Sequence, residues 1–305
     1  MMRAIIFYLV SFMVLTSNRI LAQSTLDIMF QWPIETDKIE QKLSSLFGES
    51  RGDHFHNGVD ISSDNEPVKT MGDAVILYSR YSSDNPFENE HGSGNCIWLN
   101  HESGILSAYY HLKDGRMAGL LGKSSLKKGE VIAKSGNTGH SSGSHLHFIV
   151  AINNGKKIIN ALTVLPFVSD TTPPSIGTLT LSIGNNYTYI NDGDNINVSK
   201  NYPLSIDVHD TGIKKGQRRG IKALKFDFNG IKIKESKFGE ISLKNDKWIN
   251  EDKLSFNELY YEGKYYIGDL ALRSGENTIN IIAIDYNDNK SEKSISFNVN
   301  RISKK

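Results

Sequence analysis

Two histidine pairs, each with one residue between its members, are the first feature of the sequence that could do chemistry. They are His54-Phe55-His56 and His145-Leu146-His147. In a β-strand, residues i and i+2 point to the same face, so each pair would place two imidazoles side by side. Eight of the nine histidines lie between His54 and His147. The candidate chemistry is therefore concentrated in one part of the chain.

A carboxylate follows the first of these pairs at short range. Asp60 comes four residues after His56, with Gly58 between them, and a backbone turn at the glycine would let the two side chains converge. Catalytic zinc sites use three nitrogen or oxygen ligands from the protein and keep one position open for water. His56, Asp60 and either His145 or His147 would form such a set. Two histidines and one carboxylate also describe mononuclear iron oxygenases, which remain an alternative for these residues.

Several short motifs resemble, in order and spacing, those of the lysostaphin/LytM-type zinc endopeptidases of bacterial cell walls. The resemblance runs from about Phe47 to Phe167. It rests on five segments, Phe55–Ile61 (FHNGVDI), Tyr110–Leu112 (YHL), Leu126–Ile132 (LKKGEVI), Ser135–Gly139 (SGNTG) and Gly143–Phe148 (GSHLHF).

This resemblance implies a role for individual residues. It implies that one Zn²⁺ per chain is held by His56, Asp60 and His147, and that His111 and His145 are the catalytic pair that does not bind the metal. We expect Asn57 and Tyr109 to contact substrate. The implied fold is a mainly β, antiparallel LytM-like domain of the duplicated hybrid motif type, with the metal in a groove over the sheet.

The function that we expect from the resemblance is that of an exported zinc metalloendopeptidase. It would hydrolyse peptide bonds in peptidoglycan cross-links or stem peptides, using water activated by the metal and assisted by two histidines. The alternative is a catalytically inactive LytM-like module that binds the wall or activates an amidase. Such relatives typically lose metal ligands, whereas all five key positions here keep their chemistry, which favours the enzyme.

Short β-rich segments separated by turns must position these residues. In the first half the expected strands are 74–81, 96–100, 106–111, 131–135 and 145–151, and the one expected amphipathic helix is 37–46. In the second half they are 176–183, 204–209, 223–229, 278–285 and 294–299, with clear period-2 alternation in the last two. The whole chain is therefore predicted to be mainly β.

Composition changes near the tandem prolines Pro173-Pro174, which favour a stiff extended linker. We predict a peptidase domain over 24–168, a linker over 169–175 and an immunoglobulin-like β-sandwich over 176–305. Strands at this spacing are typical of sandwiches. The C-terminal domain is a candidate for contacts with wall or envelope polymers.

The N-terminal segment indicates export. Arg3 precedes the apolar run Ala4–Thr16, which is shorter than the about 20 residues that span a bilayer, and small or polar residues follow. We predict a signal peptide over 1–23, no membrane span after its cleavage, and a location in the periplasm or at the surface of a bacterium. With 35 Lys and Arg against 34 Asp and Glu, no nucleic-acid partner is expected. The one cysteine, Cys96, excludes an intramolecular disulfide and a cysteine-based metal cluster.

Overall fold

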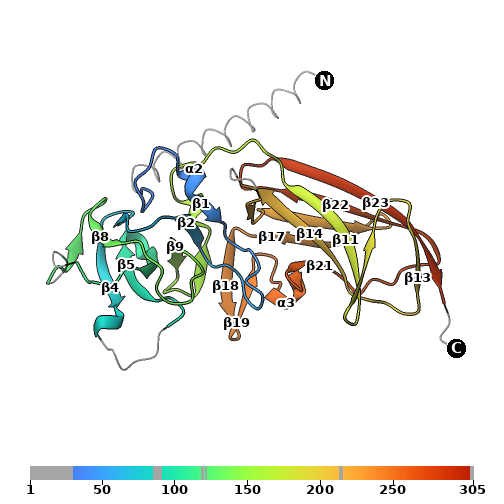
Figure 1. Ribbon diagram of the computed structural model, residues 1–305, viewed down its shortest axis with the longest axis horizontal. Coiled ribbons are helices and arrows are strands. Elements are labelled where there is room, and N and C mark those ends of the chain that lie inside the picture. Colours follow the sequence, from blue (N-terminus) through green and yellow to red (C-terminus); the bar gives the residue numbers. More distant parts are fainter. Residues whose placement is uncertain (1–29, 85–90, 118–119, 121, 213–215, 303–305) are drawn as a thin grey trace, which may run out of the picture. The chain divides into compact units, whose positions relative to one another are not determined.

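The computed structural model describes residues 30–84, 91–117, 120, 122–212 and 216–302, and it is mainly β (Figure 1). The predicted signal peptide, residues 1–23, lies outside the described residues. Among the described residues, no helix combines the length and apolar character needed to cross a bilayer.

The chain divides into two compact units that are not continuous in sequence. Unit 1 comprises the described residues through Ile39 together with Ser63–Leu146 and Ala161–Val168. Unit 2 comprises Glu40–Ser62, His147–Asn160 and the described residues from Ser169 onward. The division differs from the linear boundaries predicted above, because two short segments before residue 161 group with the C-terminal half.

Unit 1 is built from short antiparallel strands. Four of them pair in the order β7-β4-β5-β6, and β3 pairs with β8. Their bounds are β3 (Pro67–Lys69), β4 (Ala74–Arg80), β5 (Asn95–His101), β6 (Leu106–Leu112), β7 (Ser125–Leu126) and β8 (Val131–Lys134), with 3₁₀ turns at Ser82–Asp84, Glu102–Gly104 and Ala161–Thr163. The strands predicted over 74–81, 96–100, 106–111 and 131–135 are thus confirmed.

Unit 2 begins with a short helix and strand that replace the predicted helix over 37–46. Only α2 (Ile39–Lys42) is helical, and β1 (Leu43–Ser45) follows directly and pairs with β2 (Val59–Ser62). The prediction was wrong in its second half because Leu43 is buried in a strand pairing, and tertiary contacts override a short amphipathic pattern.

The next part of unit 2 is a sheet that joins segments far apart in sequence. Strand β9 (His145–Ile152), whose first two residues belong to unit 1, pairs with β2 and with β10 (Lys157–Ile159). Strand β10 pairs with β18 (Glu240–Lys244), and β18 with β19 (Lys247–Asn250). A hairpin from the C-terminal half therefore extends the sheet that carries His147.

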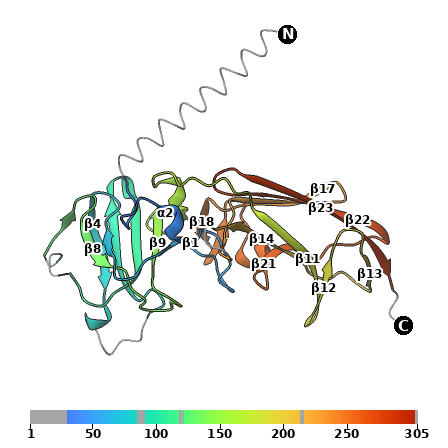
Figure 2. The ribbon, with the colours of Figure 1, turned by 45° about the horizontal axis from the view of Figure 1, so that its top comes forward.

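Two further sheets make up most of the C-terminal half, and Figures 1 and 2 show their long strands β22 and β23 side by side. The first has the order β12-β11-β14-β21-β20, with β15 on β14, and the second β13-β23-β22-β16-β17, in which β13 and β23 are parallel. Their bounds are β11 (Ser175–Ile183), β12 (Asn186–Ile190), β13 (Asn195–Val198), β14 (Leu204–Thr211), β15 (Arg218–Arg219), β16 (Ala223–Phe228), β17 (Ile231–Lys237), β20 (Tyr260–Tyr261), β21 (Lys264–Gly268), β22 (Gly275–Ile284) and β23 (Lys290–Arg301), and helix α3 is Phe256–Leu259.

The period-2 alternation predicted for this half is confirmed in β22. Ile279, Ile281 and Ala283 are buried, while the residues between them are half-buried. Alternate positions thus face the core, as a sheet with one covered face requires. The second sheet-forming region is established, whereas its immunoglobulin-like type stays a prediction.

The proline-containing segment over 169–175 is tied to unit 2. Arg219 donates to Asp170 (2.9 Å) and to Asp210 (2.8 Å), and Ser291 donates to the carbonyl of Pro174. Burial raises the pKa of Asp210 to about 6, even though the neighbouring Arg219 acts to lower it. The predicted linker is therefore held near its start by the ion pair of Asp170 with Arg219 and near its end by the hydrogen bond from Ser291.

Candidate metal centre

Three ligand-type atoms from distant parts of the sequence meet in unit 2. The Nε2 atom of His56 lies 3.0 Å from Oδ1 of Asp60 and 3.1 Å from Nδ1 of His147, and Nδ1 of His147 lies 2.8 Å from the same carboxylate oxygen. All three residues are buried. Among the alternatives left open by the spacing, the structure selects His147, and His145 is not part of this cluster.

The outer nitrogens of both imidazoles are engaged in hydrogen bonds that fix the ring orientation. Nδ1 of His56 donates to the carbonyl of Leu46 at 2.7 Å, and Nε2 of His147 donates to Oδ1 of Asn57 at 3.0 Å. With the protons on these outer atoms, each ring directs a lone pair toward the centre of the cluster. A histidine ligand with its second nitrogen bonded in this way is the usual arrangement at a metal.

The carboxylate at the centre is held in its ionised form. Burial acts to raise the pKa of Asp60, but positive charge and hydrogen bonds from His56 and His147 outweigh burial when protons, rather than a metal ion, lie between the three groups. They then hold this pKa well below its usual range. Its second oxygen, Oδ2, accepts a hydrogen bond from Arg51 at 2.6 Å. Asp60 therefore combines one oxygen for the cluster with one that is already paired.

The donor set and its spacing fit zinc. Ligand atoms placed tetrahedrally at the usual zinc distances lie about 3.3 Å from one another, close to the separations of the three atoms in this cluster. Three converging lone pairs, one of them anionic, would repel one another in a buried site without a cation between them. Two imidazoles and one carboxylate are also the ligand types that zinc accepts.

Gly58 lets the two halves of the cluster come together. A Cβ atom at this position would lie 2.4 Å from the carbonyl oxygen of Phe148 and 3.0 Å from Nε2 of His147. The backbone before β2 therefore approaches β9 more closely than any residue with a side chain would allow.

His111 and His145 lie near each other in unit 1, with ring centroids 4.8 Å apart. Nδ1 of His111 donates to the carbonyl of Thr138 (2.8 Å), and Nδ1 of His145 to the carbonyl of Gly143 (2.7 Å). In both rings Nε2 is thus the atom with the lone pair. His111 has a backbone φ of 60°, a left-handed conformation that residues other than glycine adopt at a cost and that recurs at functional sites.

Comparison with known proteins identifies the family of the segment that contains these histidines and Asp60. The family model described as "Peptidase family M23" matches residues 54–160. Residues 54–160 are an M23 peptidase domain. A second family model, which carries no functional description, matches residues 173–300.

Relatives of the M23 domain include two proteins that are named as peptidases. The chain is 30% identical over 113 residues to the DD-carboxypeptidase/endopeptidase Mpg of Neisseria meningitidis, which is 37% of this chain and 23% of Mpg. It is 31% identical over 110 residues to the peptidoglycan DD-endopeptidase ShyA of Vibrio cholerae, which is 35% of this chain and 22% of ShyA. The chain thus matches about a quarter of the length of these relatives. A zinc-containing peptidase from Vibrio cholerae resembles it in structure with a TM-score of 0.36 and 26% identity, over 47% of this chain and 40% of that one.

The two predicted substrate contacts of the M23 domain have different surroundings. Asn57 is half-buried and bonded to His147. Tyr109 is fully buried, and its hydroxyl contacts the backbone nitrogen of Met71 and Oγ of Ser107. The burial of Tyr109 favours a packing role, and its contact with substrate stays a prediction.

Sequence reasoning missed the residues that support the metal ligands from outside the motifs. Arg51 bonds to Asp60, and the carbonyl of Leu46 orients His56. Glu49 in turn accepts hydrogen bonds from Ser45 and from the backbone nitrogens of Leu46 and Gly220. A backbone carbonyl leaves no signature in residue type, whereas Arg51, a basic residue close to His56 and Asp60 in sequence, was a signal that could have been used.

Proposed function

We propose that this protein is an exported zinc metalloendopeptidase that hydrolyses peptide bonds in peptidoglycan cross-links or stem peptides. The observation that carries the proposal is the convergence of His56, Asp60 and His147 within an M23 domain. The names of Mpg and ShyA support an endopeptidase that acts on peptidoglycan.

Residues of the M23 domain and of the segment just before it would have different roles in this reaction. His56, Asp60 and His147 would hold one Zn²⁺, while Leu46, Asn57 and Arg51 fix the orientation of these ligands. A zinc ion supplies polarisation of the peptide carbonyl and a lowered pKa for the attacking water.

The catalytic pair would move protons during hydrolysis. We assign to His111 and His145 the acceptance of a proton from water and its transfer to the leaving amine, because Nε2 carries the lone pair in each ring. Strand β9 supports this assignment, since His145 and His147 are two residues apart on it and face the same side.

Export follows from the proposed substrate. Peptidoglycan lies outside the cytoplasmic membrane, and residues 1–23 have the pattern of a signal peptide. We therefore propose a location in the periplasm or at the cell surface.

Digestion of purified peptidoglycan tests the function. The zinc-loaded protein is incubated with sacculi, and the released peptides are identified by mass. We expect new amino and carboxyl termini from peptide bonds, and we expect a chelator to abolish them and added zinc to restore them. Binding to sacculi that persists in chelator, without any cleavage by the zinc-loaded protein, would instead identify an inactive binding module.

A further inference from the structure

A pocket within unit 2 lies beside the metal cluster, and nothing in the M23 match assigns it a role. Its volume is about 490 Å³, which is in the range of pockets that enclose small ligands. One side comes from the loop before β2, with His54, Phe55 and Asn57. The other side comes from the C-terminal half, with Lys247 and Trp248 of β19 and Phe256 of α3.

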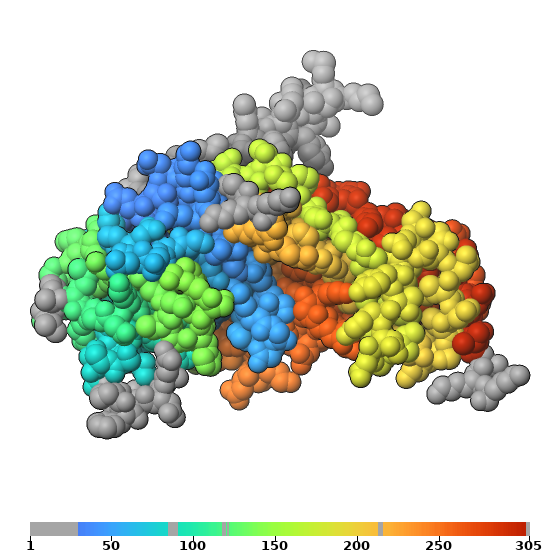
Figure 3. Space-filling model, in the orientation of Figure 1, coloured from blue at the N-terminus to red at the C-terminus, as the bar shows by residue number. Residues whose placement is uncertain are grey.

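Main-chain pairing fixes the C-terminal wall of the pocket in place. Ile158 of β10 is in register with Ile241 of β18, and the backbone nitrogen of Leu243 donates to the carbonyl of Lys156 at 2.8 Å. The ring of Phe55 packs edge-on against that of Phe256, with centroids 5.4 Å apart. Figure 3 shows the blue segment near residue 50 in contact with orange residues of the C-terminal half. The pocket is thus formed by sheet pairing and aromatic packing.

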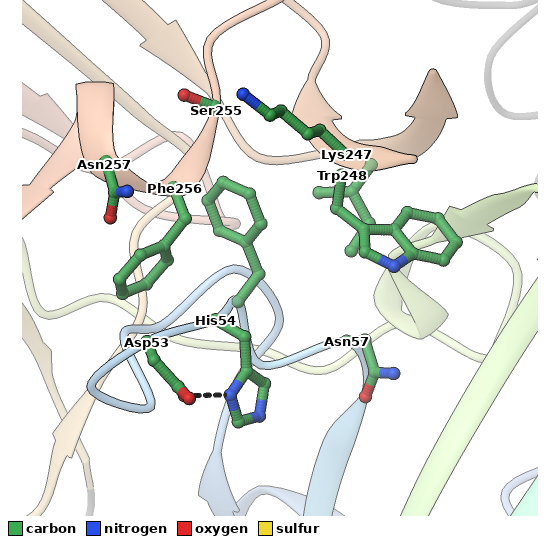
Figure 4. A pocket seen from close by; sticks show the side chains of 10 residues that line it. Asp53, His54, Asn57, Lys247, Trp248, Ser255, Phe256 and Asn257 are labelled. Carbon is green, nitrogen blue, oxygen red and sulfur yellow. Dashed lines mark hydrogen bonds and ion pairs between the residues drawn. The ribbon is translucent and has the colours of Figure 1, made fainter. Parts of the chain in front are cut away.

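The lining combines aromatic walls with the ammonium of Lys247 and the carboxylate of Asp53. Figure 4 shows Phe256 and Trp248 on opposite sides of the space, with Asn57 and His54 below and Lys247 across the top. His54 is paired with Asp53. The ammonium of Lys247 forms no ion pair within the described part of the chain, although Glu258 lies close enough to be affected by its charge. A ligand with an apolar body and an anionic group would complement this lining.

One side chain connects the pocket to the metal cluster. Asn57 lines the pocket, and its Oδ1 accepts the hydrogen bond from Nε2 of His147. The side chain of Asn57 is thus in contact both with the cluster and with the pocket.

We propose that this pocket is a subsite for a segment of the peptide substrate that carries a free carboxylate. The apolar part of the segment lies against Trp248 and Phe256, and the carboxylate reaches Lys247. The inference rests on the peptidase function proposed above, and it gives the C-terminal half a direct part in substrate choice.

Binding measurements on two forms of one ligand test the subsite. Peptides purified from peptidoglycan are used with their carboxyl groups free or converted to amides, and binding to the zinc-loaded protein is measured by calorimetry alongside kcat and KM. We expect Lys247→Glu to weaken binding of the free form, and to raise its KM, by about tenfold. Binding of the amidated form, kcat and zinc content should stay unchanged.

Two further variants distinguish binding in the pocket from a change in the overall charge of the protein. Lys253→Glu makes the same charge change on an exposed residue in the turn after β19 that does not line the pocket, and we expect no effect on binding. Trp248→Ala should weaken binding of both peptide forms by about tenfold, since it removes an aromatic wall. Thermal melting of each variant verifies that it is folded.

The possible results distinguish this inference from the peptidase proposal. Equal losses in Lys253→Glu and Lys247→Glu, or equal binding of free and amidated peptides by the wild type, would overturn the subsite. A zinc-loaded wild type that cleaves nothing, yet binds free-carboxylate peptides through Lys247, would contradict the peptidase and support the pocket as a peptide site.

Discussion

Each residue of the metal cluster has a partner that decides how it can be used. His56 and His147 direct one nitrogen inward because a carbonyl and an amide oxygen hold the other. Asp60 contributes one oxygen because Arg51 holds the second. Loss of such supporting contacts at metal sites typically costs about 10–100-fold in metal affinity or activity.

The proposed metal ligands and the proposed catalytic histidines should respond differently to substitution. We expect His147→Ala to lose zinc and activity together, because it removes a ligand. His111→Ala should keep zinc and lose turnover by about 10²–10⁴-fold, the size of a general acid–base contribution. Zinc content by elemental analysis, together with rates of peptidoglycan digestion, measures both effects.

One result would contradict the catalytic role proposed for His111. Near-wild-type cleavage by His111→Ala would remove this residue from the proposed chemistry. His209, a half-buried histidine in β14 of the C-terminal half, offers a control, since His209→Ala should leave both zinc content and rate unchanged.

At the scale of elements, the site depends on the close approach of β9 to the turn before β2. We expect Gly58→Ala to destabilise the protein by about 1–3 kcal/mol, the usual cost of forcing extra atoms into a packed region. The added methyl group would press on the carbonyl of Phe148 and on the ring of His147, so zinc affinity should fall as well. Chemical denaturation and a competitive zinc titration measure the two effects.

A second glycine-to-alanine substitution, at a position where a Cβ has space, controls for the loss of a glycine as such. A Cβ at Gly143 would meet nothing within 4 Å, and this residue does not adopt a positive φ. Gly143→Ala should therefore leave stability close to that of the wild type, and equal destabilisation by both variants would contradict the steric argument.

Local sequence patterns predicted the strands well, but they do not show which strands pair with one another. Alternation in Thr278–Asp285 and the apolar run around Leu146 identified strands that the structure contains. The pairing of β10 with β18 joins residues about 80 positions apart, and neither strand's sequence specifies which sheet edge it joins. The residues of the cluster were predictable because their types and spacing are typical of metal ligands, whereas the carbonyl of Leu46 was not.

At the scale of the whole chain, the C-terminal half holds the segment that precedes the metal ligands. Tyr260 donates through its hydroxyl to the carbonyl of Gly48 at 2.7 Å, and Tyr286 donates to that of Phe47 at 3.0 Å. Both phenols belong to the C-terminal half, and both acceptors precede His56 by fewer than ten residues. Support for the metal site thus extends beyond the M23 match.

Tyr260→Phe tests this support with a minimal change. It leaves the carbonyl of Gly48 without its buried donor, which should cost about 1–3 kcal/mol of stability. Because Leu46, which orients His56, is only two residues away, we expect weaker zinc binding too. Tyr261→Phe, at the half-buried neighbouring position, is the matched control, and unchanged zinc affinity in Tyr260→Phe would indicate that the segment is held by other contacts.

The buried pair of Asp210 and Arg219 should make stability depend on pH. Burial raises the pKa of Asp210 to about 6 from its ordinary value of 3.8, so the native state binds more protons than the unfolded state between these two values. Protonation of Asp210 therefore contributes up to about 3 kcal/mol to the free energy of unfolding. This contribution is complete below about pH 4 and is lost as the pH rises through 6. We expect Asp210→Asn to reduce the fall in melting temperature from pH 4 to 7, while Asp207→Asn, at a more exposed carboxylate of the same strand, should not.

The hydroxyl contacts of Tyr260 and Tyr286 also bear on how such proteins can be recombined. A gene fusion that transferred only residues 54–160 would lack the carbonyl of Leu46 that orients His56. It would also lack the two phenols that hold the segment carrying this carbonyl. A chimera that retains its ion would have to inherit everything from the start of β1 together with the C-terminal half. We therefore expect recombination between related genes to transfer the M23 segment together with the C-terminal half, and not the M23 segment alone.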